Sequence, residues 1–175
     1  MEQVVLLSAD GSPSGTAAKS DVHTRDTPLH LAFSCYLFHP DGRLLVTRRA
    51  LGKKTWPGVW TNSFCGHPAP GEVLSAALHR RVRQELGIAL TELRLALPDF
   101  RYRAVDAGGI VENEVCPVYT AVVADETQLS PDPDEVAEWA WVDLADLADS
   151  VARTPFAFSP WLALQLPLLL AQRGT

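Results

Sequence analysis

The sequence of 175 residues has three cysteines, one methionine and no uninterrupted apolar run of membrane-spanning length. Its longest apolar stretch, residues 161–171, is broken by Gln165 and Pro167, and it is too short to cross a bilayer. The first residues, Met-Glu-Gln, lack the basic charge that opens a secretory signal. We therefore expect a cytoplasmic protein with no membrane partner.

Disulfide frameworks and zinc-binding cysteine pairs are also excluded. Cys35, Cys65 and Cys116 are odd in number and widely spaced, with no Cys-x-x-Cys pair, so we expect free thiols in a reducing compartment. Basic residues do not predominate, since 15 Lys and Arg stand against 21 Asp and Glu, which argues against a nucleic-acid partner. Residues 1–85, however, carry ten basic and seven acidic side chains, which leaves room for a small-anion pocket.

The composition, with 47% hydrophobic and 21% charged residues, is that of an ordinary globular protein. The length predicts a single domain over residues 1–175, and we expect it to be monomeric. Strands are predicted at residues 3–8, 31–38, 44–49, 93–98, 100–104, 112–123 and 138–142. Helices are predicted at residues 72–86 and 143–150 and after Ser159-Pro160, with Pro167 bending or ending the last one. The fold class is therefore α/β (α+β), a mixed β-sheet flanked by helices.

The predicted helix at residues 72–86 has an unusual inward face. Leu74, Leu78, Arg81 and Glu85 follow one another at the spacing of a single helix face. The apolar face thus ends in an arginine and a carboxylate. The Gly- and Pro-rich residues 50–71 before it form a long loop, and such loops are often functional.

Within this loop, Cys65 and His67 lie two residues apart. In extended backbone both side chains would point to one side and share a cavity. A buried small cysteine and a loop histidine would explain the same pattern, and the residues alone leave both readings open.

Two glutamates, Glu112 and Glu114, project from one face of a strand that is otherwise apolar. Buried carboxylates are costly unless they are paired or bind a metal, so we favour a metal over a solvated edge strand. His23, His30 and His67 would complete a set of three histidines and two glutamates, suited to Mn²⁺, Zn²⁺ or Mg²⁺. Each histidine alone is more often a surface or capping residue.

Basic residues in the first half of the chain suit a phosphate or diphosphate, because Arg offers forked donors and Lys a point charge. Solvated strand ends and a polar helix face are the alternative, and we prefer it for Arg80 and Arg83. The aromatic residues Trp56, Trp60, Tyr102 and Trp161 are expected mostly in the core, although a Trp face can also stabilise a cation.

The segment GHPAPGEVLSAALHRRVRQELGI, residues 66–88, resembles the Nudix box. Glu72 and Glu85 match its glutamates, but Arg81 and Gln84 stand where two others belong. Nudix hydrolases use these carboxylates to hold Mg²⁺ for diphosphate cleavage. Their partial loss argues against hydrolysis.

More of the chain, from about residue 4 to 165, resembles the type I isopentenyl diphosphate isomerases of the Nudix superfamily. The segments TNSFCGHP and GIVENEVCPV carry the resemblance most specifically. It implies a Nudix-like sandwich and a Δ-isomerase of isoprenoid biosynthesis, which moves a double bond to convert isopentenyl diphosphate into dimethylallyl diphosphate. The alternatives are a Nudix-type diphosphate hydrolase and a degenerate Nudix module that only binds diphosphates.

The resemblance also implies roles for individual residues. Cys65 and Glu114 would transfer protons on opposite faces of the substrate, with Tyr102 assisting and Trp161 covering the hydrocarbon. Which of the two protonates is left open. A first divalent metal would bind His23, His30, His67, Glu112 and Glu114. Glu85 would hold a second Mg²⁺, bound together with the substrate diphosphate. The diphosphate contacts would be Lys19, Arg49, Lys53 and Arg81.

Overall fold

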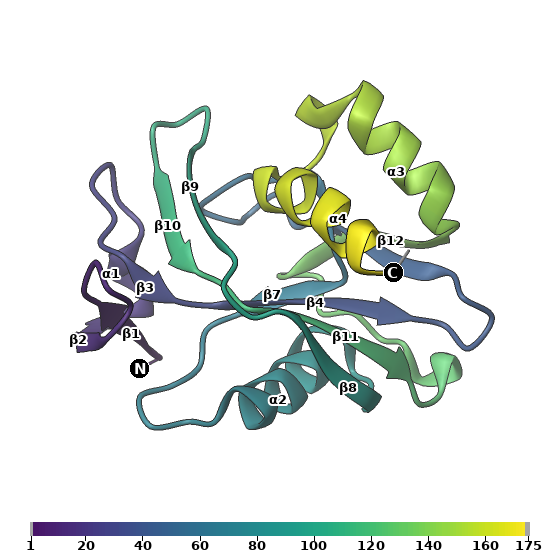
Figure 1. Ribbon diagram of the computed structural model, residues 1–175, viewed down its shortest axis with the longest axis horizontal. Helices are drawn as coiled ribbons and strands as arrows, with labels where there is room; N and C mark the ends of the chain where they lie inside the picture. The colour runs from purple at the N-terminus through teal and green to yellow at the C-terminus, as the bar shows by residue number, and fades with distance from the viewer. Residues whose placement is uncertain (1, 174–175) are drawn as a thin grey trace.

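The computed structural model describes residues 2–173, which form two β-sheets and the helices that cover them (Figure 1). The smaller sheet has the strand order β2-β1-β3-β10-β9. Its strands are β1 (Gln3–Leu7), β2 (Pro13–Ala18), β3 (His30–Leu31), β9 (Arg101–Val105) and β10 (Val111–Val115). A short helix, α1 (Lys19–Val22), follows β2.

The larger sheet has the order β12-β5-β4-β11-β8, with β6 paired to β5 and β7 paired to β4. Its strands are β4 (Phe33–Phe38), β5 (Leu44–Arg49), β6 (Trp60–Thr61), β7 (Phe64–Gly66), β8 (Leu90–Leu97), β11 (Val118–Val123) and β12 (Val136–Val142). The longer helices are α2 (Leu74–Leu86), α3 (Leu144–Arg153) and α4 (Pro160–Arg173), and the 3-10 helices are η1 (Glu126–Gln128) and η2 (Pro155–Ala157).

The larger sheet lies between α2 on one face and α3 with α4 on the other (Figure 1). Residues along β4 alternate between the two cores, as strand geometry requires. Cys35 and Leu37 pack in the cluster that contains Leu78 of α2, whereas Tyr36 packs in the cluster that contains Leu162 of α4. Both faces of β4 are therefore buried.

One predicted strand, at residues 112–123, is two strands in the structure, and Pro117 explains why. Proline has no N–H and cannot donate to a ladder. Before it, β10 pairs with β3 and β9; after it, β11 pairs with β4 and β8. The predicted strand at residues 31–38 is likewise two strands, β3 in the smaller sheet and β4 in the larger one, and between them Ala32 N donates to Val115 O.

Other boundaries also differ from the sequence prediction. Strands β2, β6 and β7 and helix α1 were not predicted, because their short polar or Gly-rich sequences carry little periodicity. Helix α2 begins at Leu74 rather than Glu72, and Gly87 ends it in the left-handed conformation at φ +70°. Pro167 lies inside α4 without ending the helix.

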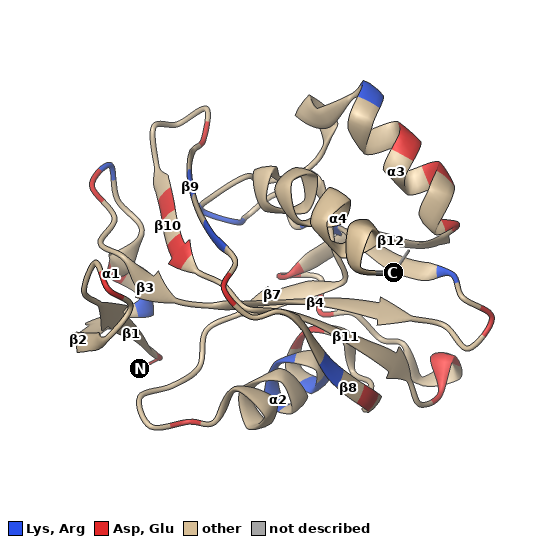
Figure 2. Cartoon of the chain, viewed as in Figure 1, with Lys and Arg blue, Asp and Glu red and all other residues tan. Residues whose placement is uncertain are grey.

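Basic residues outnumber the single glutamate, Glu85, on α2, whereas the charged residues of β10 are acidic and α3 carries two aspartates and Arg153 (Figure 2). Within residues 2–173, none of the helices combines the length and apolar character needed to cross a membrane.

Candidate active site

The site forms where the two sheets meet. The segment with β3 and β4 and the segment with β10 and β11 each pass from the smaller sheet into the larger one, and they pair in parallel in both sheets. Glu114 of β10 is the register partner of His30 in β3, and a few residues later Val118 of β11 is the partner of Ser34 in β4. Strand β7 adds to the other edge of β4 and sets Cys65 opposite Ser34. This strand pairing brings the loop thiol and the strand carboxylate to the same cavity.

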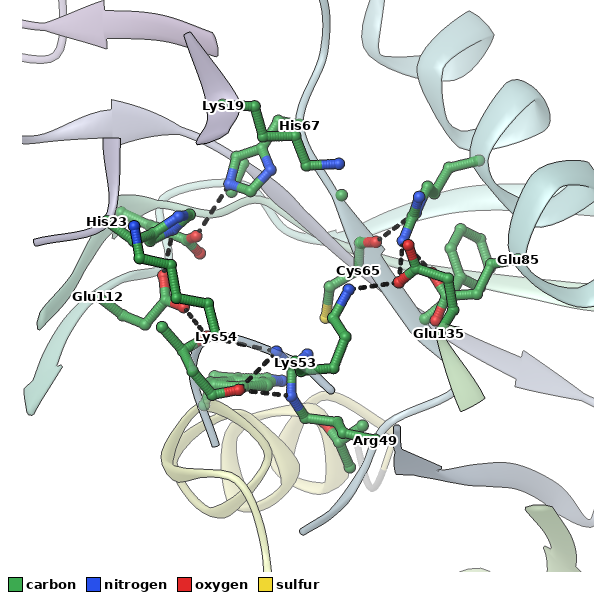
Figure 3. Close-up of a pocket in the computed structure, with 18 of the residues that line it drawn as sticks. Lys19, His23, Arg49, Lys53, Lys54, Cys65, His67, Glu85, Glu112 and Glu135 are labelled. Carbon is green, nitrogen blue, oxygen red and sulfur yellow. Dashed lines mark hydrogen bonds and ion pairs between the residues drawn. The ribbon is translucent and has the colours of Figure 1, made fainter. Parts of the chain in front are cut away.

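The cavity has a volume of about 530 Å³ and contains most of the candidate residues (Figure 3). Cys65, Glu114, Tyr102 and Trp161 all line it. So do Lys19, His23, Arg49, Lys53, His67, Arg81, Glu85 and Glu112. His30 is not among the lining residues and is completely buried behind them.

A candidate metal centre lies at one end of the cavity. One potential ligand atom from each of His23, His30, His67 and Glu114 falls within 4.8 Å of the others. The three imidazole centroids are 5.1 to 5.7 Å apart. These residues come from α1's end, β3, the turn after β7 and β10, so only the tertiary fold assembles them.

Several polar atoms in this cluster are buried without a hydrogen-bond partner, which is the feature expected of metal ligands. They include Nε2 of His23 and Nε2 of His30. His23 Nε2 is 2.9 Å from Glu112 Oε2, and His30 Nε2 is 3.4 Å from Glu114 Oε1, but neither contact has hydrogen-bond geometry. His30 Nδ1 donates to the Pro28 carbonyl at 2.9 Å, which leaves the Nε2 lone pair facing the cluster. The donor set therefore fits a divalent cation.

The ionisation state of His67 fits the same interpretation. Burial lowers the pKa of His67 to about 4 despite the nearby Glu114 carboxylate, so this ring is neutral at neutral pH, as a metal ligand must be. Burial tends to raise the pKa of Glu114, but the His30 and His67 rings beside the carboxylate outweigh it and hold that pKa well below its usual range. Glu112 lies beside the four clustered residues and accepts a 2.7 Å hydrogen bond from Thr55 Oγ1.

The Cys65 thiol lies among buried polar groups. Burial raises its pKa to about 12, so the group is a neutral thiol at neutral pH. Its Sγ donates to Asn62 Oδ1 at 3.3 Å, and the same oxygen accepts the Trp161 indole N–H at 2.9 Å. Asn62 was not predicted as a site residue. Only its place before the Cys-Gly-His motif hinted at a role.

Three of the four predicted diphosphate contacts, Lys19, Lys53 and Arg81, are paired with carboxylates in this structure. Glu135 Oε2 contacts Lys53 Nζ at 2.5 Å and Arg81 Nη2 at 2.6 Å (Figure 3). Arg81 also pairs with Glu85 at 2.9 Å, and Lys19 pairs with Glu2 at 2.6 Å. The sequence did not reveal Glu135, because the loop before β12 gives no local sign of facing the cavity.

Arg49 organises the other side of the cavity. Its Nη2 and Nε donate to the carbonyls of Thr55 and Trp56 at 2.8 and 3.1 Å, and its guanidinium carbon lies 5.3 Å from the Trp161 ring centroid. Trp56 has a positive φ of 42° and meets Trp161 edge to face, with centroids 5.6 Å apart. Arg49 thus holds the loop at Thr55 and Trp56 against the Trp161 ring.

The Nudix-box residues do not form a carboxylate cluster. Glu72 receives two 2.8 Å hydrogen bonds from Arg80, and Gln84 also contacts Arg80. Glu85 is the box carboxylate that lines the cavity, and Arg81 lies against it. This arrangement lacks the grouped glutamates that the box supplies for hydrolysis.

Comparison with known proteins shows the family of this chain. The family model described as "NUDIX domain" matches residues 28–162. The chain is 66% identical to the isopentenyl-diphosphate Delta-isomerase of Leifsonia xyli, covering 99% of this chain and 94% of the relative. It is 57% identical to the isopentenyl-diphosphate Delta-isomerase of Klebsiella pneumoniae, over 94% and 88% of the two chains. The chain belongs to this isomerase family within the Nudix superfamily.

Solved structures show the same fold at low identity. DR0079 from Deinococcus radiodurans superposes with a TM-score of 0.73 at 18% identity, covering 95% of this chain and 98% of that one. A MutT NUDIX hydrolase from Burkholderia pseudomallei gives a TM-score of 0.62 at 24% identity, over 80% and 97%. The predicted fold class and the Nudix resemblance are therefore confirmed, and the protein is an isomerase by family.

Proposed function

We propose that this protein converts isopentenyl diphosphate into dimethylallyl diphosphate, with Cys65 and Glu114 as the two proton-transferring residues. The observation that carries the proposal is that a thiol and a carboxylate, far apart in sequence, line one cavity with Tyr102 and Trp161. The reaction adds a proton to the terminal alkene carbon and removes another from C2. It therefore needs one acid and one base, on opposite faces of a substrate held between them.

The surroundings of the two groups suit this difficult protonation. An unactivated alkene is a very weak base, so the site must exclude water and stabilise the positive charge that develops at C3. Trp161 is nearly fully buried, and its ring lies 6.0 Å from that of Tyr102. An aromatic wall of this kind stabilises a cation without offering a competing nucleophile.

A divalent metal belongs to the proposal because the buried donor atoms fit one. His23, His30, His67 and Glu114 would hold it, with Glu112 as the fifth ligand. Mn²⁺, Zn²⁺ and Mg²⁺ all remain candidates. When bound, such an ion would act as a Lewis acid and make the proton donor more acidic. Glu85 would hold a second Mg²⁺ together with the diphosphate.

The charge of the cavity supports two cations and an anionic substrate. Five Lys or Arg and six Asp or Glu side chains line it, a net formal charge of −1 with neutral histidines. Two divalent cations would add four positive charges and bring the net to about +3, which balances the roughly three negative charges of a diphosphate monoester. Lys19, Arg49, Lys53 and Arg81 would contact this diphosphate.

Incubation of the protein with isopentenyl diphosphate in D₂O, with Mg²⁺ and either Mn²⁺ or Zn²⁺, tests the proposal. We expect dimethylallyl diphosphate with deuterium in the methyl group formed from the terminal alkene carbon, detected by NMR. Release of phosphate without double-bond migration would instead identify a hydrolase. Binding of the diphosphate without either product would identify a binding module.

We further propose that the enzyme acts as a cytoplasmic monomer without nucleic-acid or membrane partners. The net charge of −6 supports the absence of a nucleic-acid partner. Size-exclusion chromatography with light scattering tests the oligomeric state, and a mass of twice 19.1 kDa would contradict it.

A further inference from the structure

A row of buried polar side chains leads from helix α4 to the Cys65 thiol. Tyr36 Oη donates to Gln165 Oε1 at 3.1 Å, and Gln165 Nε2 donates to Ser34 Oγ at 3.1 Å. Ser34 Oγ then contacts Cys65 Sγ at 3.3 Å and Cys116 Sγ at 3.4 Å. Tyr36, Gln165 and Ser34 are each 0% exposed.

This row is unusual for its position in the fold. Gln165 lies among Leu162, Leu166 and Leu169, which pack α4 onto the larger sheet. A leucine there would avoid the cost of burying an amide, which is about 1–3 kcal/mol without partners. A role for the Gln165 amide is therefore expected in its contacts with Ser34 and, through Ser34, with Cys65 at the other end of the row.

The direction of each hydrogen bond follows from the number of protons available. Asn62 Nδ2 donates to the carbonyls of Cys35 and Phe64, so its Oδ1 can only accept, and the Cys65 S–H must be the donor to it. The thiol has no second proton, so in the Ser34–Cys65 contact the serine hydroxyl donates to sulfur. Gln165 keeps the hydroxyl in this orientation by occupying one of its acceptor positions.

We propose that Ser34 and Gln165 are positioning residues for Cys65. The Gln165 amide orients the Ser34 hydroxyl, and that hydroxyl holds Cys65 Sγ from one side while Asn62 holds it from the other. The sulfur then has a single rotamer, directed at the cavity. This inference rests on the proposed function, since positioning the thiol matters for turnover only if Cys65 transfers a proton.

The places of Ser34 and Gln165 outside the cavity distinguish a positioning role from a substrate-binding role. Neither Ser34 nor Gln165 lines the cavity, so neither can touch the diphosphate. Removing either group should therefore lower kcat and leave KM for isopentenyl diphosphate within about twofold. The decrease should lie between about fivefold, the value of one neutral hydrogen bond, and about 100-fold, the cost of misplacing a reacting atom by ~1 Å.

The test compares Ser34→Ala, Gln165→Met and the double variant with Ser63→Ala. Ser63 is also 0% exposed, but its hydroxyl donates to Leu45 O and accepts from Leu37 N, both at 2.7 Å, without contacting a thiol. Kinetic constants are measured per folded molecule, with folding checked by thermal unfolding. We expect Ser63→Ala to lose stability but keep kcat, and the double variant to lose no more kcat than Ser34→Ala alone.

Crystal structures of wild type and Ser34→Ala give a second readout that needs no turnover. Cys65 should occupy one rotamer in wild type and more than one in the variant. Unchanged kcat in both single variants, an effect on KM instead, or a single unaltered Cys65 rotamer in Ser34→Ala would overturn the inference. Wild-type protein that fails to isomerise the substrate would instead overturn the proposed function.

Discussion

His30 and Glu114 are register partners in neighbouring parallel strands, and their side chains meet with Nε2 and Oε1 3.4 Å apart without forming a hydrogen bond. Backbone pairing thus places His30 Nε2, which has no hydrogen-bond partner, beside a buried carboxylate that His67 also contacts at 3.2 Å. A divalent cation is the partner that suits an imidazole lone pair and a carboxylate together.

We therefore predict that His30→Ala weakens binding of the first metal by more than about 100-fold, because it removes a ligand rather than an outer-shell contact. Metal content after dialysis, measured by mass spectrometry, checks this. His79→Ala on α2 is the control, since His79 lies outside the cluster. Equal metal content in the two variants would show that the cluster does not bind the ion.

Cys65→Ala and Glu114→Gln should each abolish isomerisation while the protein still folds. Each change removes one proton-transferring group and leaves the cavity walls in place. Turnover of isopentenyl diphosphate by NMR is the measurement, with Cys35→Ala as the matched control. Cys35 is completely buried on the α2 side of β4, so its loss should cost stability and leave turnover. Near wild-type turnover by Cys65→Ala would refute the assigned role.

Glu135→Gln should bind inorganic pyrophosphate about tenfold more tightly than wild type when no metal is present. The Glu135 carboxylate forms ion pairs with Lys53 and Arg81, so it competes with an incoming anion for both side chains. Titration calorimetry measures the affinity. Glu138→Gln is the control, because Glu138 pairs with Arg48 and is exposed. Weaker binding to Glu135→Gln would mean that this carboxylate supports the anion site instead of competing for it.

We predict that ionised Glu72 contributes to the free energy of unfolding and that this contribution is lost in acid. The hydrogen bonds from Arg80 lower the pKa of the Glu72 carboxyl below its usual value of 4.5. A depressed folded-state pKa contributes stability above pH 4.5, and that contribution is lost as the pH falls through the folded-state value. Glu72→Gln should therefore flatten the profile of unfolding free energy below pH 4.5 in urea titrations. Glu92→Gln, at an exposed ion pair, should leave the profile unchanged.

Much of the site could be recognised in the sequence because its residues stand in short local patterns. Cys65 and His67, and Glu112 and Glu114, alternate along single strands or turns, and alternation is a property of extended backbone itself. The strand at Leu44–Arg49 was predicted at its true limits, since apolar residues and flanking turns mark both ends. The Nudix-box residues likewise lie within one segment.

The partners that orient these groups could not be found in this way. Ser34, Gln165 and Glu135 belong to three separate segments, and nothing in their neighbours shows that they approach Cys65 or the basic side chains of the cavity. Asn62 lies only three residues before Cys65, but that spacing does not show that its side chain contacts the thiol. The division at Pro117 also depends on tertiary contacts, because the strands on its two sides pair in different sheets.

Sequence alone thus determined the fold family, the chemical groups and their local spacing, because these depend on backbone periodicity and on side-chain chemistry. Tertiary structure decided that the Cys65 thiol and the Glu114 carboxylate share a cavity. It also decided that one carboxylate pairs with two basic side chains of that cavity, and that a buried amide donates to a serine beside the thiol. The physical reason is that strand register and helix packing are set by contacts between distant parts of the chain, which no local pattern encodes.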